Sequence, residues 1–162
     1  WAEREGDVTK GAWQAFMNIG YGKTARSPLE AEPLTMFRDG TDTYLMNRDR
    51  LLDTAISAAL AMGSDYSTQR RGALAMPGRD VWQDMIEWLQ RAAAKGHLTP
   101  HDVTTGSQIA MIVTGGDVDA GSVMSEEDIC ALERKAFLSL AKTLETRARI
   151  EHMLRFGSPL RN

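Results

Sequence analysis

Three features are scarce in this sequence of 162 residues: cysteine, long apolar runs and an excess of basic charge. The single cysteine, Cys130, excludes an internal disulfide and a zinc site built on a cysteine cluster, and it fits a reducing, cytoplasmic compartment. No apolar run approaches the ~20 residues of a membrane span, and no basic segment with a following apolar one forms a signal peptide. With 19 basic and 22 acidic residues, the net charge of −3 argues against a general nucleic-acid binder.

Motifs for catalysis and cofactor binding are also missing. Gly22-Lys23-Thr24 resembles the end of a phosphate-binding loop, but that loop requires glycine where Met17 stands. The sequence contains neither GxGxxG nor GxSxG, the glycine patterns of dinucleotide sites and of hydrolase nucleophiles. We therefore predict no catalytic residue in this chain and no cofactor of its own.

The histidines and the cysteine favour structural roles. His97 and His101 have a spacing that can bind zinc on one helix face, but the helix start at Thr99-Pro100 falls between them. His152 stands alone on the last predicted helix and is expected to be a half-buried packing residue. Cys130 has no CxxC partner and no basic cluster beside it, so it is predicted to be a buried structural thiol. No metal site is predicted.

The residues that are present favour a helical fold. Hydrophobic residues make up 43% and charged residues 25%, which is ordinary for a globular domain. Capping residues and apolar spacings of three and four predict helices over 7–20, 48–62, 81–95, 100–114, 126–141 and 144–155, with a short one after the capping box at 27–30. Asn47 and Asp80 are predicted to cap two of these helices.

Two short runs could form strands instead. Residues 43–46 are β-prone, and residues 109–113 are apolar enough for a buried strand, although the start signal at Thr99-Pro100 favours a helix there. The predicted fold class is therefore mostly α and bundle-like, with at most one short pair of β-strands.

Basic residues gather in two places. Residues 63–80 are predicted to form a long basic loop with Arg70, Arg71 and Arg79, and loops of this length are usually functional or packed on a partner. Residues 142–162 contain Lys142, Arg147, Arg149, Arg155 and Arg161. This stretch could meet phosphates or a carboxylate-rich partner, or it could be a solvated helix face.

The C-terminal third carries a resemblance to a known family. Residues 132–140, 149–154 and the ending Gly157-Ser-Pro-Leu-Arg-Asn162 resemble the end of the multidomain 3-hydroxyacyl-CoA dehydrogenases of bacterial fatty-acid β-oxidation. Residues 112–118 with Gly121 resemble the glycine-bearing turn of that family, and residues 44–52 resemble its segment leaving the crotonase core, where a short strand is followed by a helix.

The resemblance implies an architecture. The chain would be the helical tail of a crotonase-type enoyl-CoA hydratase region, with residues 1–62 as the end of the crotonase core and linking helices, 63–80 as a basic loop and 81–162 as a C-terminal helical subdomain. The oxyanion-hole amides and the acid/base glutamates would precede Trp1, and a start at Trp1 in place of methionine agrees with a fragment.

The resemblance also implies a role. The parent enzyme would use NAD and a CoA thioester, whereas this part would pack on the preceding crotonase core and dehydrogenase domains of the same chain. It would support a homo-oligomer, help to close the CoA site and be inactive in isolation, without contacts to nucleic acid or a membrane. Met153, Arg155 and Phe156 fall where related crotonases contact CoA, although the local sequence departs from the family pattern there.

Two other interpretations remain open. An independent helical interaction module would also explain the apolar helix faces and the missing active site. A helix-turn-helix DNA binder is disfavoured, because its recognition helix would begin Pro100-His101-Asp102 and would carry almost no basic residue.

Overall fold

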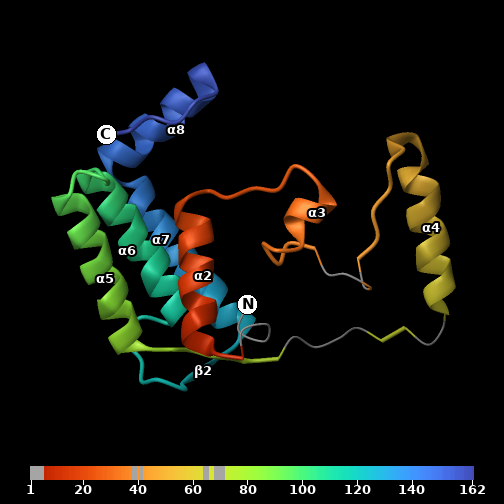
Figure 1. The fold of residues 1–162 in the computed structure, drawn as a ribbon, viewed down its shortest axis with the longest axis horizontal. Coiled ribbons are helices and arrows are strands. Elements are labelled where there is room, and N and C mark those ends of the chain that lie inside the picture. The colour runs from red at the N-terminus through yellow and green to blue at the C-terminus, as the bar shows by residue number, and fades with distance from the viewer. Residues whose placement is uncertain (1–5, 38–39, 41, 64–65, 68–71) are drawn as a thin grey trace. The chain divides into compact units, whose positions relative to one another are not determined.

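The computed structural model describes residues 6–37, 40, 42–63, 66–67 and 72–162 (Figure 1). Its helices are α2 (Val8–Gly20), α3 (Pro28–Ala31), the 3₁₀ helix η1 (Arg48–Arg50), α4 (Leu51–Met62), α5 (Arg79–Ala94), α6 (Pro100–Thr114), α7 (Glu126–Ala141) and α8 (Leu144–Phe156). Strands β1 (Leu74–Ala75) and β2 (Val123–Met124) pair antiparallel. The prediction of a mostly α fold with one short strand pair is confirmed.

The chain divides into two units. One contains residues 1–23 and 72–162, and the other contains residues 24–71. Helix α2 thus belongs with the C-terminal helices, although residues 24–71 lie between them in the sequence. The sequence-based division at 62/63 and 80/81 refers to the architecture of a longer parent and stays a prediction.

Local capping signals locate most helix starts. Thr99 with Asp102 and Ser125 with Asp128 form capping boxes in which side chain and backbone bond reciprocally. Asp7 caps α2 by accepting hydrogen bonds from the Thr9 and Lys10 amides. The capping box at Thr99 favours a helix for α6, which continues through residues 109–113, the apolar run that the sequence left open to a strand.

Two local predictions were wrong. Residues 43–46 are not a strand, and the strand pair is formed by β1 and β2 instead. Asp80 does not cap α5, because the helix begins at Arg79, two residues earlier than predicted, and its N-cap is Gly78. The Gly78 amide donates to the Thr114 carbonyl and the Arg79 amide donates to the Val118 carbonyl, so contacts with a distant turn fix where α5 begins.

The core of the larger unit lies where α2, α5 and α6 meet. Its buried apolar residues are Ala12, Phe16, Met85, Leu89 and Ala110. Trp13 and Trp88 surround Phe16 edge to face, with ring centroids 5.7 Å and 5.9 Å from the phenyl ring. Buried Gly106 lets α5 and α6 approach closely, because a Cβ there would lie 2.7 Å from Leu89 Cδ2.

The smaller unit buries much less. Within this described part, α4 has no buried residue, and Leu52 and Leu60 are 70% and 76% exposed. Asn47 caps η1 by accepting from the Asp49 amide, which confirms it as the start signal of the predicted helix 48–62. Phe37 and Tyr44 pack edge to face with centroids 6.0 Å apart.

Candidate functional site

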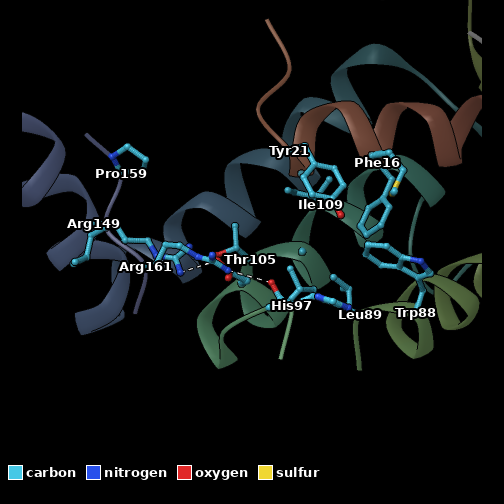
Figure 2. A pocket seen from close by; sticks show the side chains of 16 residues that line it. Phe16, Tyr21, Trp88, Leu89, His97, Thr105, Ile109, Arg149, Pro159 and Arg161 are labelled. Atoms are coloured by element: carbon cyan, nitrogen blue, oxygen red, sulfur yellow. Dashed lines mark hydrogen bonds and ion pairs between the residues drawn. The ribbon is translucent and has the colours of Figure 1, made fainter. Parts of the chain in front are cut away.

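A cavity of about 540 Å³ opens in the larger unit between α2, α5, α6 and the C-terminal segment 157–162 (Figure 2). Its apolar wall includes Phe16 and Met17 from α2, Trp88 and Leu89 from α5, and Ile109 from α6. Small-molecule sites are commonly concave, mostly apolar and of this size. The cavity is therefore the candidate site of this unit.

Charged side chains line the cavity toward the C-terminal segment. They are Asp102 of α6, Arg149 of α8 and Arg161 of the segment itself. Figure 2 shows Arg149 and Arg161 on the opposite side of the group from Phe16 and Trp88, with Thr105 and Ile109 between them. The cavity thus has an apolar side and a polar side.

Arg149 organises the polar side. Its Nη2 donates to Asp102 Oδ1 at 2.8 Å and to Thr99 Oγ1 at 3.2 Å. Its Nε donates to Asn162 Oδ1 at 2.7 Å. One guanidinium therefore joins the start of α6, the helix α8 and the C-terminal segment, which is the kind of forked contact that arginine makes well.

The charge state of Asp102 follows from the same contacts. Burial by itself raises the pKa of Asp102, but the hydrogen bonds from the Thr99 amide and from Arg149 outweigh burial and hold the pKa below its ordinary value. Asp102 is consequently ionised near neutral pH and is engaged by two donors. It is a poor candidate for a general base.

The C-terminal segment is held along its length. Arg161 Nη2 donates to the His97 carbonyl at 3.1 Å, and Asn162 Nδ2 donates to the Glu145 carbonyl at 3.2 Å. His152 Nδ1 lies 2.9 Å from the Ser158 carbonyl. The ending that resembles the dehydrogenase family is thus a structural element that closes one side of the cavity.

The three predicted CoA-contacting residues do not line the cavity. Met153, Arg155 and Phe156 lie on α8, with Met153 46% and Phe156 67% exposed. Arg155 pairs with Glu151 at 2.7 Å, and the Phe156 ring packs against His152 with centroids 4.7 Å apart. Their contact with CoA stays a prediction.

The three histidines of the chain lie on or beside helices α6 and α8. His101 is buried in the first turn of α6, where its Nε2 lies 2.8 Å from Thr146 Oγ1 on α8. His97 lies in the loop before α6 and lines the cavity. Among the described residues, no group of three or more His, Cys, Asp or Glu side chains is arranged to hold a metal ion.

The prediction for Cys130 was wrong. Its side chain is exposed. Helix α7 buries one residue, Ala136, against its neighbours, and Ile129, Leu132 and Leu140 are half-buried on the same side. Cys130 follows Ile129 on the helix and therefore points away from that side.

The basic loop is described in part. Arg70 and Arg71 lie outside the described residues. Arg79 begins α5 and pairs with Asp117, and its Nη1 lies 4.0 Å from Asp119 Oδ1. The hydrogen bond and the charge of Asp117 raise the pKa of Arg79. This arginine therefore stabilises the turn after α6.

Sequence reasoning missed the link between Asp102 and Arg149. The capping pattern at Thr99 was visible, but the two charged partners stand 47 residues apart. Nothing local in the sequence signals that pairing.

No helix in the described part of the chain is both long enough and apolar enough to cross a membrane.

The chain is similar to a probable 3-hydroxyacyl-CoA dehydrogenase of Bacillus subtilis (strain 168). The two are 29% identical over 157 residues, which cover 96% of this chain and 20% of that protein. The chain thus spans about a fifth of the length of this curated relative. No protein-family profile matches the chain. No solved structure matches it.

Proposed function

We propose that this chain is a helical, non-catalytic part of a longer enzyme of the 3-hydroxyacyl-CoA dehydrogenase type, acting in fatty-acid β-oxidation. The observation that carries the proposal is the similarity along 96% of the chain to a protein about five times as long. The active sites of such an enzyme would lie in its other parts.

The described side chains support a non-catalytic role. Within the cavity, the carboxylate of Asp102 is held by Arg149 and Thr99. Thr105 also lines it, and no base is paired with this hydroxyl among the contacts of the cavity lining. These groups suit binding and positioning better than nucleophilic or acid–base chemistry.

The parent reaction would require NAD, and the described residues of this chain do not match a dinucleotide-binding site. A dinucleotide site places GxGxxG between a strand and a helix. The closest glycines here are Gly20, which ends α2, and Gly22, which follows it, and both described strands have two residues. We assign this chain no part in holding NAD.

The finer role that we propose is to pack on a crotonase-type hydratase core, to support oligomerisation and to help close the CoA site. Large apolar side chains are exposed on α7 and α8, including Phe137 at 61% and Leu154 at 82%. Such surfaces mark contacts with other protein. Arg155, Met153 and Phe156 on α8 would face the CoA moiety.

Activity assays test the proposal. The 162-residue chain should neither hydrate crotonyl-CoA nor oxidise 3-hydroxybutyryl-CoA with NAD. Turnover of either substrate would contradict it. In the longer enzyme, Arg155→Gln should raise the KM for the CoA thioester and leave kcat unchanged, and Glu87→Gln on α5 is the control.

An independent helical interaction module is the second candidate, favoured by the same exposed apolar faces. The coding sequence upstream of Trp1 separates the two. A hydratase core with a glycine-rich oxyanion segment there supports the enzyme part, and a start codon or a linker supports the module.

A further inference from the structure

The cavity combines an apolar wall with a surplus of positive charge. Phe16, Trp88 and Ile109 provide aromatic and aliphatic surface. The charged lining residues are two arginines and one aspartate. The formal charges of these three side chains sum to +1.

The two arginines differ in their hydrogen-bond partners: Arg149 pairs with a carboxylate, and Arg161 donates to a backbone carbonyl. Arg149 lies 2.8 Å from the carboxylate of Asp102, and the two side chains are 24% and 23% exposed. Arg161 donates to the His97 carbonyl, and none of the ion pairs between described residues includes it. A guanidinium has five donors, so Arg161 keeps the capacity to bind an anion.

We propose that this cavity binds a small carboxylate with an apolar chain. The carboxylate would accept hydrogen bonds from Arg161, and the chain would lie along Thr105 and Ile109 toward Phe16 and Trp88, the direction in which Figure 2 shows these residues. An arginine beside an apolar cavity matches an anion attached directly to an apolar chain.

The position of the negative charge on the ligand distinguishes a free fatty carboxylate from a CoA thioester. In a free fatty carboxylate, the anion stands at the end of the chain, where Arg161 can reach it. In a CoA thioester, the acyl chain ends in a neutral carbonyl and the phosphates lie far away. The free carboxylate should therefore bind more tightly than the thioester. This binding site does not depend on the proposed function, because it rests on the cavity and its charges.

Calorimetric titration of the 162-residue chain with sodium decanoate, below its micelle concentration, tests the proposal. Decanoate should bind with one-to-one stoichiometry, and decanol and decanoyl-CoA should bind more weakly. Arg161→Gln should weaken decanoate binding about tenfold, as expected for losing one charge-assisted hydrogen bond. Arg91→Gln is the matched control, because Arg91 pairs with Glu87 on an exposed face outside the cavity.

A second variant tests the cavity itself. Thr105 lines the cavity and is half-buried, so Thr105→Phe should fill the space and abolish binding. Far-UV circular dichroism and urea unfolding establish that each variant is folded. Chemical-shift changes at the Trp88 indole should accompany decanoate binding and be absent in Thr105→Phe.

Three results would overturn the proposal. Equal affinity for decanoate and decanol would show that the negative charge of the ligand does not contribute to binding. Unchanged binding in folded Arg161→Gln and Thr105→Phe would mean that the chain adsorbs on the exposed apolar helices instead. Absence of decanoate binding to the folded wild-type chain would reject the site directly. None of these results would alter the outcome of the activity assays, so failure here is distinct from failure of the proposed function.

Discussion

Arg149 of α8 donates a 2.8 Å hydrogen bond to Asp102, which stands in the first turn of α6 and also closes the capping box of that helix. The carboxylate of Asp102 therefore forms hydrogen bonds with both the start of α6 and the helix α8. It accepts from the Thr99 amide at 2.9 Å through Oδ2 and from Arg149 through Oδ1. The start of α6 and the position of α8 are thereby coupled.

Asp102→Ala should lower the free energy of unfolding by about 2 kcal/mol, since the loss of the capping-box hydrogen bond costs about 1 kcal/mol and the loss of the charge-assisted hydrogen bond from Arg149 costs about as much again. Urea unfolding followed by circular dichroism measures the effect. Glu87→Gln is the control, because the exposed Glu87–Arg91 pair should contribute less than about 1 kcal/mol. Equal effects of the two substitutions would contradict the coupling.

Acidification should destabilise the chain partly through Asp102. Its pKa in the folded state lies below the ordinary value, so the unfolded state binds the proton first as the pH falls. The stabilisation is complete above the unfolded pKa of about 3.9 and is lost as the pH falls through the lower folded pKa. Hydrogen bonds from Ser125 lower the pKa of Asp128 in the same direction.

The measurement is urea unfolding from pH 6 down to pH 2.5. Wild type should lose more stability across this range than Asp102→Asn, because the amide cannot titrate. If the two proteins show parallel pH profiles, the low pKa of Asp102 does not contribute to folding.

Gly78 and Gly121 form a natural matched pair. Both have a positive φ, +82° and +83°, but a Cβ at Gly78 would lie 2.7 Å from the Val118 carbonyl oxygen and the Ala120 amide, whereas a Cβ at Gly121 would meet nothing within 4 Å. Gly121→Ala should cost about 1–2 kcal/mol from backbone strain alone. Gly78→Ala should cost about 1–3 kcal/mol more, because backbone atoms must move.

Thermal and urea unfolding of the two alanine variants measure this difference. Equal destabilisation would mean that the close approach between the start of α5 and the turn 115–121 has no energetic weight. The hydrogen bonds from Gly78 and Arg79 to the Thr114 and Val118 carbonyls, at 3.0 Å and 2.8 Å, give the reason to expect otherwise.

These contacts show which features the sequence can predict. A capping box depends on two residues three positions apart, so the helix starts at Thr99 and Ser125 could be predicted from the sequence. The true start of α5 depends on Gly78 meeting residues 114–120, and the exposure of Cys130 depends on which side of α7 is covered. Both depend on contacts far apart in the sequence, which local patterns do not encode. The cavity also depends on such contacts, because α2 and the C-terminal segment line it from opposite sides (Figure 2).

The exposed apolar side chains of α7 and α8 give the last prediction. Phe137, Leu144 and Leu154 are 61%, 75% and 82% exposed. Contiguous apolar patches larger than a few hundred Å² are rare on monomers. We therefore expect the 162-residue chain to self-associate at high concentration, in the absence of the protein that would otherwise cover these helices.

Sedimentation velocity across a concentration series measures the association. The double variant Phe137→Ser/Leu154→Ser should shift the distribution toward monomer, because it removes apolar area that association would bury. Gln90→Ser is the control, since Gln90 is an exposed polar residue on α5. A wild-type chain that stays monomeric at the highest concentration would show that these faces are tolerated in water, and it would weaken the proposal that they pack on a neighbouring domain.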